Sequence, residues 1–243
     1  MAGGMSLLSA MKLHLAAPSA LIDLSGIEHL REIVVSEEVV SIGSMVTHAV
    51  VAASADVKAY LPVIATLAFG IGDRQVRNRG TIGGSLANND PAACYPAGVL
   101  VLGATIETNL RKISADDFFI GMFETVLRPD EVVTCVHFPI PVRAAYVKFH
   151  QPASRFALVG VLVSELRNGE IRVAVTGAGS CVFRSSEVER ELARSFTSEA
   201  AEAATVRGDG LNSDIHGNSE YRAHLIPVLA ARAVSIILRS RSL

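Results

Sequence analysis

Thr81-Ile82-Gly83-Gly84-Ser85-Leu86 is the most informative stretch of this chain, and Ala2-Gly3-Gly4-Met5-Ser6-Leu7-Leu8 shares its design. Each presents a Gly-Gly pair followed closely by a serine hydroxyl. Glycine has no Cβ and tolerates positive φ, so backbone N–H groups at such turns can approach a phosphate closely. Two turns of this kind predict one large anionic ligand held from both sides, such as a dinucleotide with its pyrophosphate between them.

The composition indicates a chain with a substantial apolar core and no nucleic-acid-binding surface. Half of the 243 residues are apolar, and the net charge is −2 with acidic and basic residues interspersed. Because there is no basic run, we expect no nucleic-acid partner. Cys94, Cys135 and Cys181 are isolated from one another, and none belongs to a cysteine–histidine cluster. We therefore expect no zinc or iron–sulfur site on this chain and a reducing compartment.

Apolar segments of the chain are too short or too interrupted to predict a membrane span. No stretch reaches the roughly 18 consecutive apolar residues that a membrane helix needs. The most apolar candidate, residues 225–238, contains Pro227 and Arg232 and is expected to be a packed helix. Because the first Gly-Gly turn follows Met1 at once, we expect no signal peptide and a cytoplasmic protein.

The first part of the chain predicts a mixture of short strands and helices. Apolar runs at residues 21–24, 39–43, 105–108 and 131–138 are typical of strands. Thr47 is the expected N-cap of a helix reaching residue 53, and a second helix is predicted over 61–69. Pro96 suits the first turn of another helix, which ends near residue 102.

Pro139-Ile140-Pro141 is the predicted domain boundary, because two prolines interrupt any regular element. Beyond it, the Asn168-Gly169 pair predicts a hairpin between strands at 157–166 and 171–176. Ser186 and Glu189 form an expected capping box for a helix reaching residue 194, and a long helix is expected from Ser219. The predicted class is α+β, with domains at 1–140 and 141–243.

Both glycine stretches, read with their neighbours, resemble the FAD-binding medium subunit of molybdenum hydroxylases, a group that includes the carbon monoxide dehydrogenase and xanthine dehydrogenase family. Residues 2–12 are similar to its first flavin-binding segment. Residues 75–87, followed by Asp90-Pro91-Ala92-Ala93, are similar to the second segment and form the more specific match. The resemblance continues along essentially the whole chain, through residues 118–119, 124–131, 146–149, 152–161, 214–217 and 220–222.

The resemblance implies both the fold and the role of the chain. The expected fold is an FAD-binding domain of the vanillyl-alcohol-oxidase type, followed by a smaller α+β domain of the carbon monoxide dehydrogenase flavoprotein type. A separate large subunit would carry the molybdenum cofactor, and a small subunit would carry two [2Fe–2S] clusters. Electrons would pass from those clusters through FAD on this chain to an external acceptor.

Site residues follow from the same resemblance, position by position. The first stretch would line the pyrophosphate with Ala2, Gly3, Gly4, Met5 and Ser6, and Leu7 would pack nearby. The second would meet the phosphate and ribityl chain with Thr81, Gly83, Gly84 and Ser85, and Asp90 would lie near the ribityl chain or the adenosine ribose. Leu127 and Lys148 would lie close to the isoalloxazine ring, with Phe156 beside it. Without the resemblance, a structural role is as good an interpretation as flavin contact for both residues: Lys148 as a solvated strand lysine and Phe156 as a core residue.

Two departures from the family pattern also generate expectations. Cys94 stands where the family commonly has an aspartate, so one hydrogen bond to FAD is expected to be absent. The family also carries a further βαβ-like unit of roughly 30 residues before the first glycine turn. We therefore expect this chain to lack a strand that feeds the turn.

Two other classes of function stay open at this point. A cofactor-free assembly or scaffold subunit of the same type of complex is favoured by Cys94 and by the early position of the first turn. A stand-alone flavin oxidoreductase would need a catalytic acid or base, for which the sequence offers no candidate. The seven histidines form no pair with ligand spacing, and each is expected to be structural.

Overall fold

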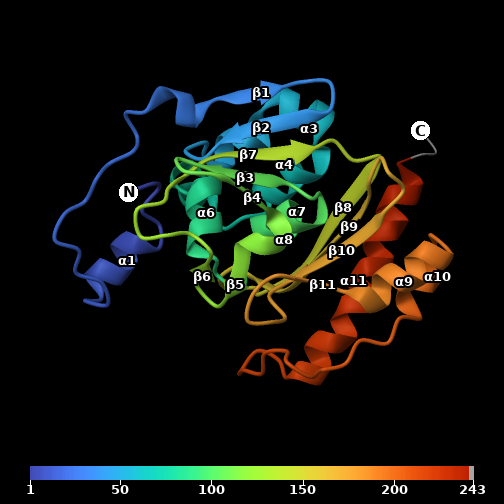
Figure 1. Ribbon diagram of the computed structural model, residues 1–243. Coiled ribbons are helices and arrows are strands. Elements are labelled where there is room, and N and C mark those ends of the chain that lie inside the picture. The colour runs from blue at the N-terminus through green and yellow to red at the C-terminus, as the bar shows by residue number, and fades with distance from the viewer. Residues whose placement is uncertain (241–243) are drawn as a thin grey trace.

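Antiparallel sheets and the helices packed on them account for most of the computed structural model, which describes residues 1–240 (Figure 1). A five-stranded sheet has the order β1-β2-β7-β3-β4, and a four-stranded sheet has the order β11-β10-β9-β8. A two-stranded ribbon pairs β5 (Phe119–Gly121) with β6 (Glu124–Thr125). The architecture is α+β, as the sequence predicts.

The five-stranded sheet forms because its strands alternate apolar and polar residues, which gives the sheet one buried face. Val40 and Ile42 are buried in the strand at 39–43, and Ile106 is buried in the strand at 105–108. Strands predicted at 39–43 and 105–108 are confirmed. The strands are β1 (Ile33–Val35), β2 (Val39–Gly43), β7 (Val133–Pro139), β3 (Thr105–Thr108) and β4 (Lys112–Ser114).

Short helices cover the buried face of this sheet, and polar side chains start several of them. Thr47, Asp73 and Thr81 each accept a hydrogen bond from a backbone N–H in the first turn of their helices. The helices of this part of the chain, of which α1 and α5 contain no buried residue, are α1 (Leu7–Lys12), η1 (Glu28–Arg31), α2 (His48–Ala53), α3 (Ala55–Tyr60), α4 (Pro62–Phe69), α5 (Arg74–Arg79), α6 (Ile82–Asn88), α7 (Tyr95–Val101) and α8 (Ala115–Phe118). Thr47 as a cap and the helices predicted at 61–69 and from Pro96 are confirmed.

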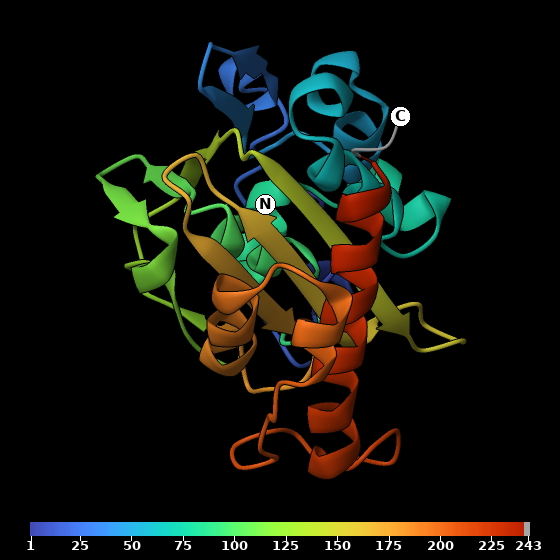
Figure 2. The same ribbon diagram turned by 90° about the vertical axis from the view of Figure 1, so that its right-hand side faces the viewer.

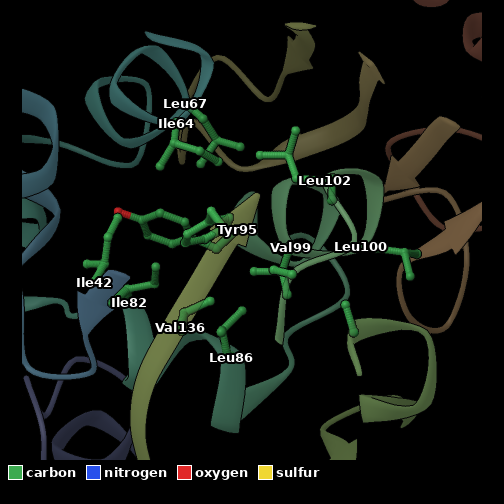
Figure 3. Close-up of a cluster of buried hydrophobic side chains, with 14 of the residues drawn as sticks. Ile42, Ile64, Leu67, Ile82, Leu86, Tyr95, Val99, Leu100, Leu102 and Val136 are labelled. Atoms are coloured by element: carbon green, nitrogen blue, oxygen red, sulfur yellow. The ribbon is translucent and has the colours of Figure 1, made fainter. Parts of the chain in front are cut away.

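The larger core cluster lies between these helices and the sheet. Tyr95 is fully buried, and Figure 3 shows side chains from β2, α4, α6 and β7 gathered around its ring. Leu162 and Ala174 join the same cluster from the four-stranded sheet. This shared packing fixes the position of one sheet relative to the other.

The four-stranded sheet is buried on both faces at its centre, so β9 reads as a continuous apolar run. A smaller core cluster lies on its other face, where α11 crosses the strands (Figure 2). The predicted hairpin is confirmed, with Gly169 at φ +84° in its turn. The elements are β8 (Arg143–His150), β9 (Ala157–Glu165), β10 (Ile171–Thr176), β11 (Phe183–Arg184), α9 (Ser186–Arg194), α10 (Ser198–Glu202) and α11 (Ser219–Arg239).

The helix α11 is, within residues 1–240, the one element long and apolar enough to cross a membrane. In this structure 61% of its most apolar window is buried inside the protein. Its apolar character is explained by packing on β8 and β9. Pro227 lies inside this helix.

Two local predictions are wrong. Residues 21–24 form no strand, because no neighbouring strand pairs with them and Ile22 is 76% exposed. Ser186 and Glu189 form no capping box, since the N-cap is Ser185 and its side chain makes no capping hydrogen bond. The Glu189 carboxylate instead accepts from the Val173 N–H at 2.9 Å and pairs with Arg184 at 2.7 Å.

A buried arginine joins the start of α11 to the sheet. The Arg222 side chain donates from Nη1 to the carbonyls of Leu158 and Gly177, both at 2.8 Å. Its Nη2 donates to Asp214 Oδ2 at 2.7 Å, and the residue is only 3% exposed. Three separate segments therefore depend on one guanidinium group.

We expect Arg222→Met to lower the free energy of unfolding by about 3 kcal/mol, because two buried carbonyls lose their donor. Urea unfolding followed by circular dichroism measures this change. The matched control is Arg232→Met, an exposed arginine on the same helix, which should change stability by less than about 0.5 kcal/mol. Equal losses in the two variants would contradict this account of Arg222.

Candidate functional site

A cleft of about 310 Å³ lies between the N-terminal segment, α6 and the loop before β9, a volume at the lower end of the range of ligand sites. Both glycine stretches line this cleft, although about 80 residues separate them in the chain. Figure 1 shows α1 and the N-terminus on the same side of the molecule as α6. The site residues expected from the sequence that line it are Ala2, Gly3, Gly4, Met5, Ser6, Leu7, Thr81, Gly84, Ser85, Asp90, Lys148 and Phe156.

The two stretches touch directly, and glycine makes the contact possible. A Cβ on Gly3 would lie 2.0 Å from the Arg79 carbonyl oxygen, which no side chain tolerates. A Cβ on Gly84 would lie 3.4 Å from the Ala2 Cβ. Gly4 has φ +75°, a conformation that favours glycine. The first stretch is thus docked on the backbone that leads into the second.

Backbone donors are available in the first stretch. Among residues 1–240, no acceptor is hydrogen-bonded to the N–H groups of Ala2, Gly3, Gly4, Met5 or Ser6. Five successive free N–H groups beside a cleft are the arrangement that binds anions such as phosphate. The first stretch therefore has the donors that a pyrophosphate needs.

Backbone donors of the second stretch are already used. The Gly83 N–H donates to the Ser44 carbonyl at 2.9 Å, and the Gly84 N–H donates to Thr81 Oγ1 at 3.2 Å. The Ser85 N–H donates to the Thr81 carbonyl at 3.0 Å. This differs from the expectation that both turns offer N–H groups, because residues 82–88 continue as a helix. The second stretch offers the cleft a close-packed surface and the Ser85 side chain.

Lys148 links two loops at the edge of the cleft. Its Nζ donates to the Gly70 carbonyl at 2.7 Å and to the Arg155 carbonyl at 3.0 Å. Cys94 Sγ lies 3.7 Å away and accepts the third contact. Phe156, next to Arg155, is 53% exposed at the rim. The lysine thus places the 151–156 loop against the turn after α4.

Asp90 and Cys94 line the same cleft as Phe156, although they are distant from it in sequence. Asp90 Oδ1 accepts from the Ala92 N–H at 2.8 Å, which fixes the turn after α6. Cys94 is 5% exposed. By resemblance an aspartate is expected at this position. The thiol that stands there instead contacts Lys148.

Gly83 and Leu127 are the two expected site residues that do not line the cleft. A Cβ on Gly83 would lie 2.5 Å from the Ser44 Cβ, so this glycine allows α6 to pack on the segment after β2. Leu127 packs against the larger core cluster. In this structure neither residue belongs to the cleft lining.

Sequence reasoning missed His48, which lines the cleft although it was expected to be structural. The residue is 5% exposed, and its Nδ1 has no hydrogen-bond partner among residues 1–240. Its ring lies 5.3 Å from the Tyr95 ring. Burial lowers the pKa of His48 to about 4, helped by the nearby charge of Arg77. The imidazole is therefore neutral at physiological pH, and no motif in the sequence marks it.

We expect the folded chain to lose stability as pH falls from about 6.5 towards 4. In this range His48 binds a proton in the unfolded state but stays neutral in the folded state, where its pKa is lower. The contribution is fully present above pH 6.5, and its loss at pH 4.5 is about 2 to 3 kcal/mol. Urea unfolding at pH 7.5 and 4.5 should show a smaller loss for His48→Leu than for wild type. The exposed His29→Leu should behave as wild type, and an equal loss in all three proteins would refute the assignment.

Comparison with known proteins gives the family. The family model described as "FAD binding domain in molybdopterin dehydrogenase" matches residues 1–141. The nicotine 6-hydroxylase medium subunit of Paenarthrobacter nicotinovorans is 38% identical, with 96% of this chain and 87% of that protein covered. The carbon monoxide dehydrogenase medium chain of Hydrogenophaga pseudoflava is 33% identical over 97% of this chain and 87% of that protein.

Solved structures agree with these sequence matches. A chain of carbon monoxide dehydrogenase from Hydrogenophaga pseudoflava superposes with a TM-score of 0.88 at 33% identity, covering 98% of this chain and 88% of that one. A chain of quinoline 2-oxidoreductase from Pseudomonas putida 86 gives 0.88 at 30% identity, covering 99% and 89%. The chain therefore belongs to the family of FAD-binding medium subunits of molybdenum hydroxylases, which includes the carbon monoxide dehydrogenase medium chains.

Proposed function

We propose that this chain is the FAD-binding electron-transfer subunit of a molybdenum-containing hydroxylase complex. The observation that carries the proposal is the run of five free N–H groups at residues 2–6, which line a cleft shared with α6. A diphosphate needs such donors, and glycine at position 3 holds them in place. FAD, when bound, supplies the redox chemistry that connects iron–sulfur clusters of a partner to an external acceptor.

The residues present fit the proposed cofactor. Ala2, Gly3, Gly4, Met5 and Ser6 would hold the pyrophosphate through their N–H groups, with Leu7 packed beside them. Thr81, Gly84, Ser85 and Asp90 would form the facing wall, and Lys148 and Phe156 would lie near the isoalloxazine ring. Gly83 and Leu127 belong to the proposed site by resemblance alone, since neither lines the cleft.

The proposed partners are a large subunit with the molybdenum cofactor and a small subunit with [2Fe–2S] clusters. Support comes from the relatives, whose names describe medium subunits, medium chains or a subunit of a dehydrogenase complex. We further propose that the chain works in the cytoplasm and binds neither membrane nor nucleic acid. The proposed domains are 1–140, for the cofactor, and 141–243, because the two core clusters lie mainly on either side of this boundary.

An absorbance spectrum of the native complex tests the proposal. We expect flavin bands in stoichiometric amount, together with molybdenum and iron on the copurifying subunits. A complex that contains molybdenum and iron without flavin would contradict the proposal and favour a cofactor-free scaffold subunit. Flavin on a chain that copurifies with neither metal would instead favour a stand-alone flavin oxidoreductase.

We expect Gly3→Ala to weaken FAD binding by about tenfold or more, equivalent to about 1.4 kcal/mol, because the added Cβ would displace the first stretch from the Arg79 carbonyl. Titration of the deflavinated protein with FAD, followed by flavin fluorescence, measures the affinity. The matched control is Gly26→Ala, where an added Cβ meets no atom within 4 Å. Wild-type affinity in Gly3→Ala would show that this close approach does not shape the site.

A further inference from the structure

His48 lines the cleft with a side chain that packs against Tyr95 but has no hydrogen-bond partner among residues 1–240. The residue is 5% exposed, and its Nδ1 is buried without a partner. Within residues 1–240 no hydrogen bond to its Nε2 is formed either. We propose that His48 is an FAD-binding residue, whose neutral imidazole forms a hydrogen bond with an oxygen of the bound nucleotide. This inference rests on the proposed function.

The energetic argument starts from the missing partner. A buried polar atom without a hydrogen bond destabilises a folded protein by about 1 to 3 kcal/mol, so most such atoms in native structures have partners. An apolar side chain of similar size at position 48 would avoid that cost and would still fill the space beside Tyr95. Nε2 also has no partner among residues 1–240 and is not fully buried, so it is the ring nitrogen that a ligand in the cleft can reach.

The surrounding structure holds the imidazole in a defined position. Thr47 caps α2, and the His48 backbone N–H donates to the Gly80 carbonyl at 2.9 Å. The Tyr95 ring packs against the imidazole with the two planes at 50°. A pre-positioned side chain loses little conformational freedom when a ligand binds.

Gly80 gives independent support for a site built around this ring. A Cβ on Gly80 would lie 2.5 Å from His48 Nε2 and 2.8 Å from Cδ2. The backbone of Gly80 has φ −61° and ψ 140°, which any residue adopts. Glycine is therefore required here by the closeness of the imidazole and not by backbone conformation.

The position of Gly80 also indicates which part of the nucleotide is involved. The hypothetical Cβ of Gly3 lies 2.0 Å from the Arg79 oxygen and 3.0 Å from the Gly80 Cα. The first glycine stretch and His48 thus both contact the Arg79–Gly80 backbone. In the proposed site, an oxygen of the diphosphate–ribityl region would be the nucleotide group held beside the five free N–H groups and His48. A neutral imidazole has one N–H donor, which suits an oxygen acceptor.

Two variants at position 48 test the inference by FAD titration of the deflavinated complex at pH 8. His48→Leu removes both ring nitrogens and should weaken FAD binding about 5- to 20-fold, with no loss of stability in the FAD-free protein. His48→Gln keeps a polar group that reaches about as far as Nε2 and should bind within about threefold of wild type. Gly80→Ala should displace the imidazole ring and weaken FAD binding as much as His48→Leu does. The double variant His48→Leu/Gly80→Ala should lose no more FAD affinity than either single variant.

His137→Leu is the matched control, since this histidine lies on the five-stranded sheet outside the cleft lining and should leave the FAD affinity unchanged. Wild-type affinity in His48→Leu would overturn the inference while leaving the proposed function intact. Loss of affinity in His48→Gln that matches its loss of stability would also overturn it, since a structural role would then suffice. Failure of the wild-type complex to bind FAD would overturn the proposed function itself.

Discussion

The close approach of Gly3 to the Arg79 carbonyl is the contact on which the candidate site depends. It brings an N-terminal segment with no buried residues in its first helix onto the framework of α5 and α6. The N–H groups of residues 2–6 have no acceptor among residues 1–240, and these five residues line the cleft. The same geometry both anchors the segment and keeps its donors available.

The rest of the cleft is supplied by elements that are fixed by packing. The capped starts of α2 and α6 place His48 and Ser85, and the core around Tyr95 holds these helices on the five-stranded sheet. Lys148 comes from the four-stranded sheet, whose β9 shares that core through Leu162. A ligand in the cleft would therefore contact helices packed on the five-stranded sheet and Lys148 of the four-stranded sheet. This arrangement is consistent with a cofactor held between two parts of the chain.

Sequence patterns predicted the elements whose residues interact locally. Alternation in β2, the Thr47 cap and the Asn168-Gly169 turn each encode their structure within a few residues. Residues 21–24 carry the apolar character of a strand but find no pairing partner, which only the tertiary fold decides. Glu189 has the spacing of a capping box, yet Arg184 and Val173 compete for its carboxylate from β11 and β10.

For the site, the glycine motifs located the cleft, but they did not distinguish free N–H groups from paired ones or reveal His48. Both features depend on contacts between distant segments.

A crystal structure of the chain with FAD is the most direct test of the proposed site. We expect the pyrophosphate oxygens to lie within hydrogen-bond distance of N–H groups in residues 2–6. FAD bound with its pyrophosphate away from these groups, or in another cavity, would contradict it.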